Sequence, residues 1–484
     1  MNYIWIRNTI VTILLCLTTN SFAQDSFPLY TSFYNLDLSF DFNQDMMKGI
    51  CKMKIVNQSS KTVNQLPIIL YRLMKVKSVK NANGVDLHFS QKVDQFTDFP
   101  ELQVNTLLIK EKFLPHQTRN IVITYDGYLL GYQETGTNYI RDKISSEFTI
   151  IRNDAFTYPI IAKPQTSFLR KNIALHNFDY KIRVSVPDSL VVANGGILKS
   201  IVREKGISVF EYTSKKPNWR IDIAISAYKK LNNEGFGIFY FEKDSTYASN
   251  ISKIGIKTIK LYKEWWGELK SNNTLSIIET EKETGGQADE MTILLPQEAF
   301  TENGSYMNLY HELSHLWNVR INENKGLSPR WEEGLATFCQ YIAEEKLNSE
   351  KELSTKRITD QYIKRLKTDF ERNPNLLRVP IIDFGNENLT NYSYTQGMLM
   401  FSVLYYWVGE SNFNQVIKNF YQHYYSTGAS TSDFTKLWEK SIPNENLNQF
   451  FDDWMYGTKY TEFITKDMSV DYIIAHYKQL GQSR

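Results

Sequence analysis

The periodicity of apolar residues changes partway along the chain, and this change constrains the fold more than any other feature of the sequence. From about residue 30 to residue 230, runs such as YNLDLSFDF and WRIDIAISAY alternate apolar and polar residues, as half-buried strands do. Turn residues separate the runs, for example at Asn83-Gly84 and Pro187-Asp188. Many short strands separated in this way predict an antiparallel β-sandwich.

The pattern becomes helical in the second half of the chain. Near Asn233 the segments GIFYFE and LSIIET still indicate strands, but the segment between them has apolar residues at helical spacing. Beyond Tyr306 almost every segment predicts helix. We expect Trp265 and Trp266, within the first of these helices, to pack in a core or a domain interface rather than bind a ligand. A chain of 484 residues is too long for one ordinary core.

We therefore predict an α+β protein with two domains. The β-sandwich is expected over residues 24–231 and a mainly helical domain over residues 232–466, followed by a C-terminal tail at residues 467–484. Residues 1–23 have one Arg, an apolar run and small residues before Ala23, which indicates a cleavable signal peptide. Export to a periplasm or to the outside of the cell follows, with an uncleaved anchor or a buried first strand as the alternative.

Charge and cysteine content exclude several other classes of protein. The net charge is +2 with no basic block, so the electrostatic signature of nucleic-acid binding is missing. After the signal peptide only Cys51 and Cys339 remain, and they fall in different predicted domains. The sequence therefore predicts neither a disulfide framework nor a cysteine zinc site. No later stretch is long and apolar enough to span a bilayer.

The stretch NLYHELSHLWNVR holds two of the chain's seven histidines, His311 and His315. Four residues are about one helical turn, so both imidazoles are expected on one side of a helix. This H-E-x-x-H arrangement can bind Zn²⁺ through two nitrogens and places Glu312 to act on a metal-bound water. A catalytic zinc needs a third protein ligand and an open position. A chance occurrence on an ordinary helix is the alternative.

The following segment, NENKGLSPRWEEGLATFCQ, offers the third ligand. Gly326 can end the first helix, and Ser328 can cap the next, with Pro329 in its first turn. A helix–loop–helix of this kind returns the chain to the two histidines. We expect Glu333 to be the ligand and Glu332 to be a solvated acid on the helix face.

The chain contains HELSH, followed after 17 residues by EGLATF. This pattern resembles that of the zinc aminopeptidases related to aminopeptidase N and leukotriene hydrolase, with a loop one residue shorter. The resemblance implies that His311, His315 and Glu333 hold one Zn²⁺ per chain and that Glu312 is the general base. It covers about residues 30–463 and implies a thermolysin-like catalytic domain. It also indicates a short form, without the large C-terminal helical domain of longer members and with a more open site.

Two further segments resemble the same family. In NYSYTQGMLMF, Tyr394 is implied as the donor to the oxyanion, with Tyr392 as a weaker candidate and a buried core tyrosine as the alternative. The family's G-x-M-E-N segment, whose Glu holds the substrate's amino group, is replaced by TGGQADEMTILLP. The implied substrate-binding residues in this segment are Gly285, Gly286 and either Asp289 or Glu290.

These features predict an exported, zinc-dependent peptidase that acts on peptide substrates in an aminopeptidase-like manner, with endopeptidase action left open. A neighbouring family, the glycyl aminopeptidases, shares the Trp317-Asn318-Val319 run, but the short gap to Glu333 argues against it. The alternative function is a catalytically altered metallopeptidase scaffold that binds a peptide or a partner. The altered G-x-M-E-N segment supports this alternative weakly, and the complete set of ligands, base and tyrosine opposes it.

Overall fold

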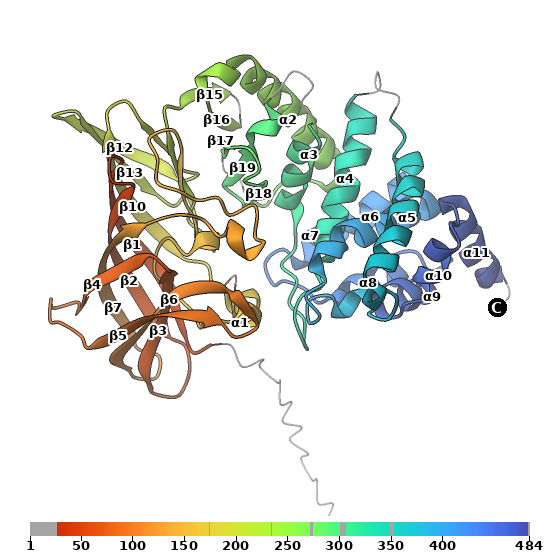
Figure 1. Cartoon of the computed structure of the whole chain (residues 1–484). Helices are drawn as coiled ribbons and strands as arrows, with labels where there is room; N and C mark the ends of the chain where they lie inside the picture. The colour runs from red at the N-terminus through yellow and green to blue at the C-terminus, as the bar shows by residue number, and fades with distance from the viewer. Residues whose placement is uncertain are drawn as a thin grey trace, which may run out of the picture.

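The computed structural model describes residues 27–173, 175–233, 235–271, 274–300, 306–348 and 353–482. The predicted signal peptide lies outside these residues. Figure 1 shows a β-rich N-terminal half beside a helical C-terminal half, so the predicted α+β fold of two domains is confirmed.

The β-rich domain is built mainly from a seven-stranded and a four-stranded sheet. Apolar residues on alternate positions of these strands meet in one core, as in β2, where every second residue is buried. The seven-stranded sheet contains, in order, β12 (Ile197–Glu204), β13 (Ile207–Thr213), β10 (Asp179–Pro187), β1 (Leu29–Asp41), β2 (Met46–Asn57), β7 (Thr118–Tyr128) and β4 (Met74–Asn81). The four-stranded sheet contains β5 (Phe89–Phe96), β6 (Phe99–Phe113), β3 (Val63–Tyr71) and β9 (Ile160–Ile161).

One strand pair departs from the expected antiparallel arrangement. β1 and β10 pair in parallel, which is feasible because more than a hundred residues separate them and can make the crossover. The short helix α1 (Thr166–Asn172) lies within this crossover. A three-stranded sheet completes the domain, with β11 (Val191–Ala193), β14 (Ile223–Ser226) and β8 (Thr149–Ile151).

A five-stranded mixed sheet opens the helical domain. Its strands β16, β17 and β19 run parallel, and β17 and β19 are buried along their whole length, as strands inside a parallel sheet are. β15 begins two residues before the predicted domain boundary, so the chain passes between the domains just after β14. In order, the strands are β15 (Lys229–Asn233), β16 (Phe236–Tyr240), β17 (Leu275–Thr280), β19 (Thr292–Pro296) and β18 (Gln287–Ala288).

Helices form the rest of this domain around an extensive apolar core. Trp266 is buried in that core, as expected for a packing residue. Cys51 and Cys339 are free and buried in separate cores. The helices are α2 (Ser245–Trp266), α3 (Met307–Ser314), α4 (Trp331–Leu347), α5 (Thr355–Arg372), α6 (Ser393–Val408), α7 (Glu410–Tyr424), α8 (Thr431–Ser441), α9 (Leu447–Phe451), α10 (Tyr460–Thr465) and α11 (Val470–Gln482).

The segment expected as a C-terminal tail contains α11, and its side chains Val470, Ile473 and Tyr477 are buried in the same core. The helical core therefore extends beyond residue 466. In the described part of the chain, no helix combines the length and hydropathy that a membrane crossing requires.

Two glycines bring α4 and α6 together beside the predicted ligands. A Cβ built at Gly334 would lie 2.4 Å from the Cα of Gly397, so the two helix backbones are in contact. Gly334 follows Glu333 directly, and Gly397 is three residues after Tyr394. The close approach, which only glycine allows, therefore places the first turns of both helices at one point.

Candidate active site

His311 and His315 lie side by side, as their spacing predicts. Their ring centroids are 4.8 Å apart, with the ring planes at 83°. The helix is shorter than expected, because α3 ends at Ser314 and His315 begins a single 3₁₀ turn that ends at Trp317. Gly326 does not end this helix and lies in the loop that follows, with φ +81°.

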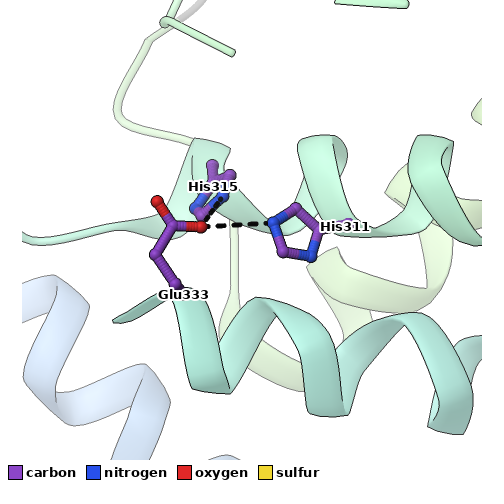
Figure 2. A group of neighbouring side chains, drawn as sticks. All are labelled: His311, His315 and Glu333. Carbon is purple, nitrogen blue, oxygen red and sulfur yellow. Dashed lines mark hydrogen bonds and ion pairs between the residues drawn. The ribbon is translucent and has the colours of Figure 1, made fainter. Parts of the chain in front are cut away.

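Glu333 returns to the two histidines from the first turn of α4 (Figure 2). Its Oε2 atom is 3.3 Å from Nε2 of His311 and 3.3 Å from Nε2 of His315. The approach to the helix differs from the prediction. The Ser328 hydroxyl accepts a hydrogen bond from the backbone N–H of Arg330, which has φ +58°, and the helix begins only at Trp331.

The three donor atoms fit a zinc ion in number, in chemistry and in charge. They lie within 4.8 Å of one another and comprise two imidazole nitrogens and one carboxylate oxygen. Burial alone would raise the pKa of Glu333, but the charges of Arg330 and His315 hold it well below its usual range. Burial alone would lower the pKa of His315, but the Glu333 charge raises it to about 9. Glu333 is therefore ionised, as a carboxylate that binds a metal must be.

Two residues outside the predicted site contact this cluster. The Asn318 side-chain amide lies 2.7 Å from Nδ1 of His315, and Nε2 is the ring nitrogen that faces Glu333. Arg330 forms an ion pair with the other carboxylate oxygen of Glu333. Asn318 belongs to the Trp-Asn-Val run, which offered a signal for it, whereas no sequence pattern singled out Arg330.

The cluster opens into a cleft of about 1140 Å³ between the two domains. The helical domain contributes the three predicted metal ligands to its walls, and also Glu312 and Tyr394. The β-rich domain contributes Tyr139, Arg152, Asp154, Asn177, Asn218 and Trp219.

Glu312 is 7% exposed, and burial raises the pKa of its carboxyl group. Gly286 packs directly on this side chain, because a Cβ built at Gly286 would lie 2.2 Å from the Glu312 Oε1 atom. The glycine-rich segment, predicted to bind substrate, therefore also holds the predicted base in position.

Replacing Gly286 with Ala should displace the Glu312 carboxylate while leaving the metal ligands untouched. We expect kcat to fall by roughly 10²-fold, the order of loss that a 1 Å misplacement can produce. Zinc content by metal analysis should stay at one per chain. Gly237→Ala is the matched control, since its new Cβ meets nothing closer than 3.5 Å. Unchanged kcat in Gly286→Ala would show that the contact with Glu312 does not matter.

The two acids predicted as alternatives for amine binding are both engaged by other groups. Asp289 is buried and accepts hydrogen bonds from two backbone amides and, at 2.8 Å, from Asn218. Glu290 accepts a hydrogen bond of 2.8 Å from the Tyr425 hydroxyl and forms an ion pair with Lys216. Both line the cleft, but each carboxylate already has partners within the protein.

Tyr394 lies beside the histidines, and its competitor Tyr392 packs against the helical core. The Tyr394 ring is stacked on the His311 ring with centroids 5.9 Å apart and planes at 8°. Burial and the Glu333 charge raise the pKa of Tyr394 well above its usual range, so the phenol keeps its proton.

Glu332 differs from the solvated acid that we expected. Its Oε2 atom is buried and has no hydrogen-bond partner among the described residues. Burial raises the pKa of Glu332 to about 7. The late start of α4 explains the difference, since Glu332 stands in the first turn at the cleft wall rather than on a solvent-facing surface.

Comparison with known proteins gives a consistent family. Residues 290–454 match the Peptidase family M1 domain, whereas no curated protein matches the chain. Among solved structures, the chain is similar to the M1 zinc metallopeptidase from Deinococcus radiodurans in a mutant form, at 14% identity and TM-score 0.62, covering 88% of this chain and 94% of that one. The same mutant with a bound Tyr-Ser-Ala substrate gives 14% identity and TM-score 0.61, covering 89% of this chain and 94% of that one. Yeast LTA4 hydrolase in complex with bestatin gives 14% identity and TM-score 0.61, covering 89% and 68%.

Proposed function

Since residues 290–454 match the Peptidase family M1 domain, we propose that the chain is an exported zinc metallopeptidase that removes N-terminal residues from peptides. The observation that carries the proposal is the convergence of His311, His315 and Glu333 at the wall of the cleft, with Glu312 beside them. A cleft of about 1140 Å³ has room for several residues of a peptide.

His311, His315 and Glu333 would hold the zinc ion, which when bound would supply a Lewis acid that lowers the pKa of water and polarises a carbonyl group. The residues of the chain do the rest. In the proposed reaction, Glu312 accepts a proton from the attacking water and passes it to the nitrogen of the leaving amine. Gly286 keeps the Glu312 carboxylate in place.

We propose that the Tyr394 hydroxyl donates a hydrogen bond to the carbonyl oxygen as it gains negative charge. Replacing Tyr394 with Phe should lower kcat by about 10²- to 10³-fold, the loss that follows removal of one such donor. Zinc content should not change. Tyr392→Phe removes a hydroxyl two residues away and should retain activity. A fall in activity for Tyr392→Phe alone would reverse the assignment of the two tyrosines.

A digest of a defined peptide pool tests the proposed activity. Each peptide is supplied with a free and with an N-acetylated amino terminus, and the products are mapped by mass spectrometry before and after zinc removal. We expect zinc-dependent cleavage after the first residue of the free peptides only. Equal rates on both sets would contradict exopeptidase action. Stoichiometric zinc without any cleavage would contradict the enzyme and favour a peptide-binding scaffold.

Export is proposed from the N-terminal stretch MNYIWIRNTIVTILLCLTTNSFAQ, whose apolar run and small residues suit a cleaved signal peptide. The mature protein, isolated from the periplasm or the medium after expression of the full chain, should begin at Gln24. An N-terminal peptide that still contains residues 1–23 would contradict cleavage.

A further inference from the structure

Tyr139 is 47% exposed and lines the cleft. It belongs to the connection between β7 and β8, so the β-rich domain supplies it to the wall opposite the helices. An exposed aromatic side chain is ordinary in itself. The contacts that position Tyr139 are unusual, because they involve two fully buried charged side chains.

Arg152 and Asp142 form that support. Each is 1% exposed, and they are joined by an ion pair of 2.7 Å. The Arg152 guanidinium also donates a hydrogen bond of 2.9 Å to the backbone carbonyl of Tyr139, and its central carbon lies 6.0 Å from the centroid of the Tyr139 ring. A buried ion pair is costly to desolvate and contributes little net stability. Its direct effect here is to hold one exposed ring at one position.

Ion pairs to the helical domain attach the same connection from the other side. Arg141 pairs with Glu283, and Lys143 pairs with Glu281 at 3.2 Å. A Cβ built at Gly285 would lie 3.6 Å from the Cβ of Tyr139, so the tyrosine packs on the glycine-rich segment. The next residue of that segment is the glycine that packs on Glu312. Tyr139 therefore packs on the segment whose next residue contacts the predicted base.

We propose that Tyr139 is the platform for the substrate side chain next to the cleaved bond, and that it favours aromatic side chains. The inference rests on the proposed function. An aromatic ring gains from stacking on another ring beyond the area that it buries. Because Tyr139 is already held at its backbone and over its ring, little conformational entropy is lost when a substrate packs against it.

Two peptides that differ only in the residue before the cleaved bond, Phe or Ala, test the assignment. Wild-type protein should show the higher kcat/KM for the Phe peptide. Tyr139→Ala should lower kcat/KM for the Phe peptide by about 10-fold, mainly through KM, and change it by less than about twofold for the Ala peptide. Tyr139→Phe keeps the ring and should retain the preference. An unchanged Phe-to-Ala ratio, or an equal loss for both peptides, would overturn the proposal.

Leu130→Ala is the matched control, because Leu130 is 67% exposed in the same connection and is not among the residues lining the cleft. Calorimetry with the zinc-loaded Glu312→Gln protein gives a reading that needs no turnover. There, adding Tyr139→Ala should weaken binding of the Phe peptide by about 10-fold and leave the Ala peptide unchanged. If wild-type protein cleaves no peptide, the proposed peptidase function fails. This binding comparison then decides the role of Tyr139 separately.

Discussion

Replacing Glu312 with Gln should lower kcat by about 10²- to 10⁴-fold, the contribution typical of a positioned general base. Gln has nearly the shape of Glu but cannot accept a proton at neutral pH, so the substitution removes the chemistry and little else. Glu312 is not one of the three clustered donors, and zinc should therefore stay at one per chain. Steady-state kinetics and metal analysis on the same preparation measure both quantities.

Two features make this prediction specific. The Glu312 side chain is buried and lies against Gly286, so a loss cannot be attributed to a distant surface change. Glu371→Gln, an exposed acid on α5, is a suitable control and should keep wild-type activity. Peptide hydrolysis at the wild-type rate by Glu312→Gln would show that another group takes the proton.

Replacing Glu333 with Ala should remove zinc and, with it, activity. Its Oε2 atom is the point where both histidine Nε2 atoms meet at 3.3 Å, and the change leaves two nitrogens that cannot complete a zinc site. Zinc affinity should fall by at least about 100-fold, since even the loss of outer hydrogen-bond partners costs 10- to 100-fold. Competition with a chromophoric chelator measures the affinity directly.

Thermal unfolding offers an independent measurement of the same change. A ligand at 100 times its Kd stabilises the folded state by about 2.7 kcal/mol. Added zinc should therefore raise the Tm of the wild-type apoprotein and leave the Tm of Glu333→Ala unchanged. Glu332→Ala is the natural control, because Glu332 is the preceding acid in the same helical turn and lies outside the donor cluster. Stoichiometric zinc in Glu333→Ala would remove the basis of the proposed metal centre.

The sequence predicted the type of each domain because the burial pattern of a strand or a helix is local. Alternating residues in β2 indeed face one core, and β17 and β19 are buried throughout. The ends of elements were less predictable. His315 leaves the α-helix, and Ser328 accepts a hydrogen bond from Arg330 instead of capping α4, because competing turn geometries are decided by their neighbours.

The metal-binding residues could be predicted from the sequence for the same local reason. Two histidines one turn apart must face the same side, and a short connection limits how far Glu333 can be from them. The contacts around these residues could not be predicted from the sequence. Asp289 and Glu290 carry the right charge for amine binding, but hydrogen bonds to Asn218 and Tyr425, far along the chain, engage them.

Spacing along the chain was enough to indicate the class of each domain and the two histidines on one side of a helix, since these depend on helical and strand geometry over a few residues, whereas the choice of Glu333 as third ligand also followed from the family resemblance. Contacts between distant segments placed Gly286 against Glu312, Gly334 against Gly397, and Tyr139 on its buried arginine. These contacts arise when segments of one domain fold against each other, and no pattern within a short stretch records which residues will meet.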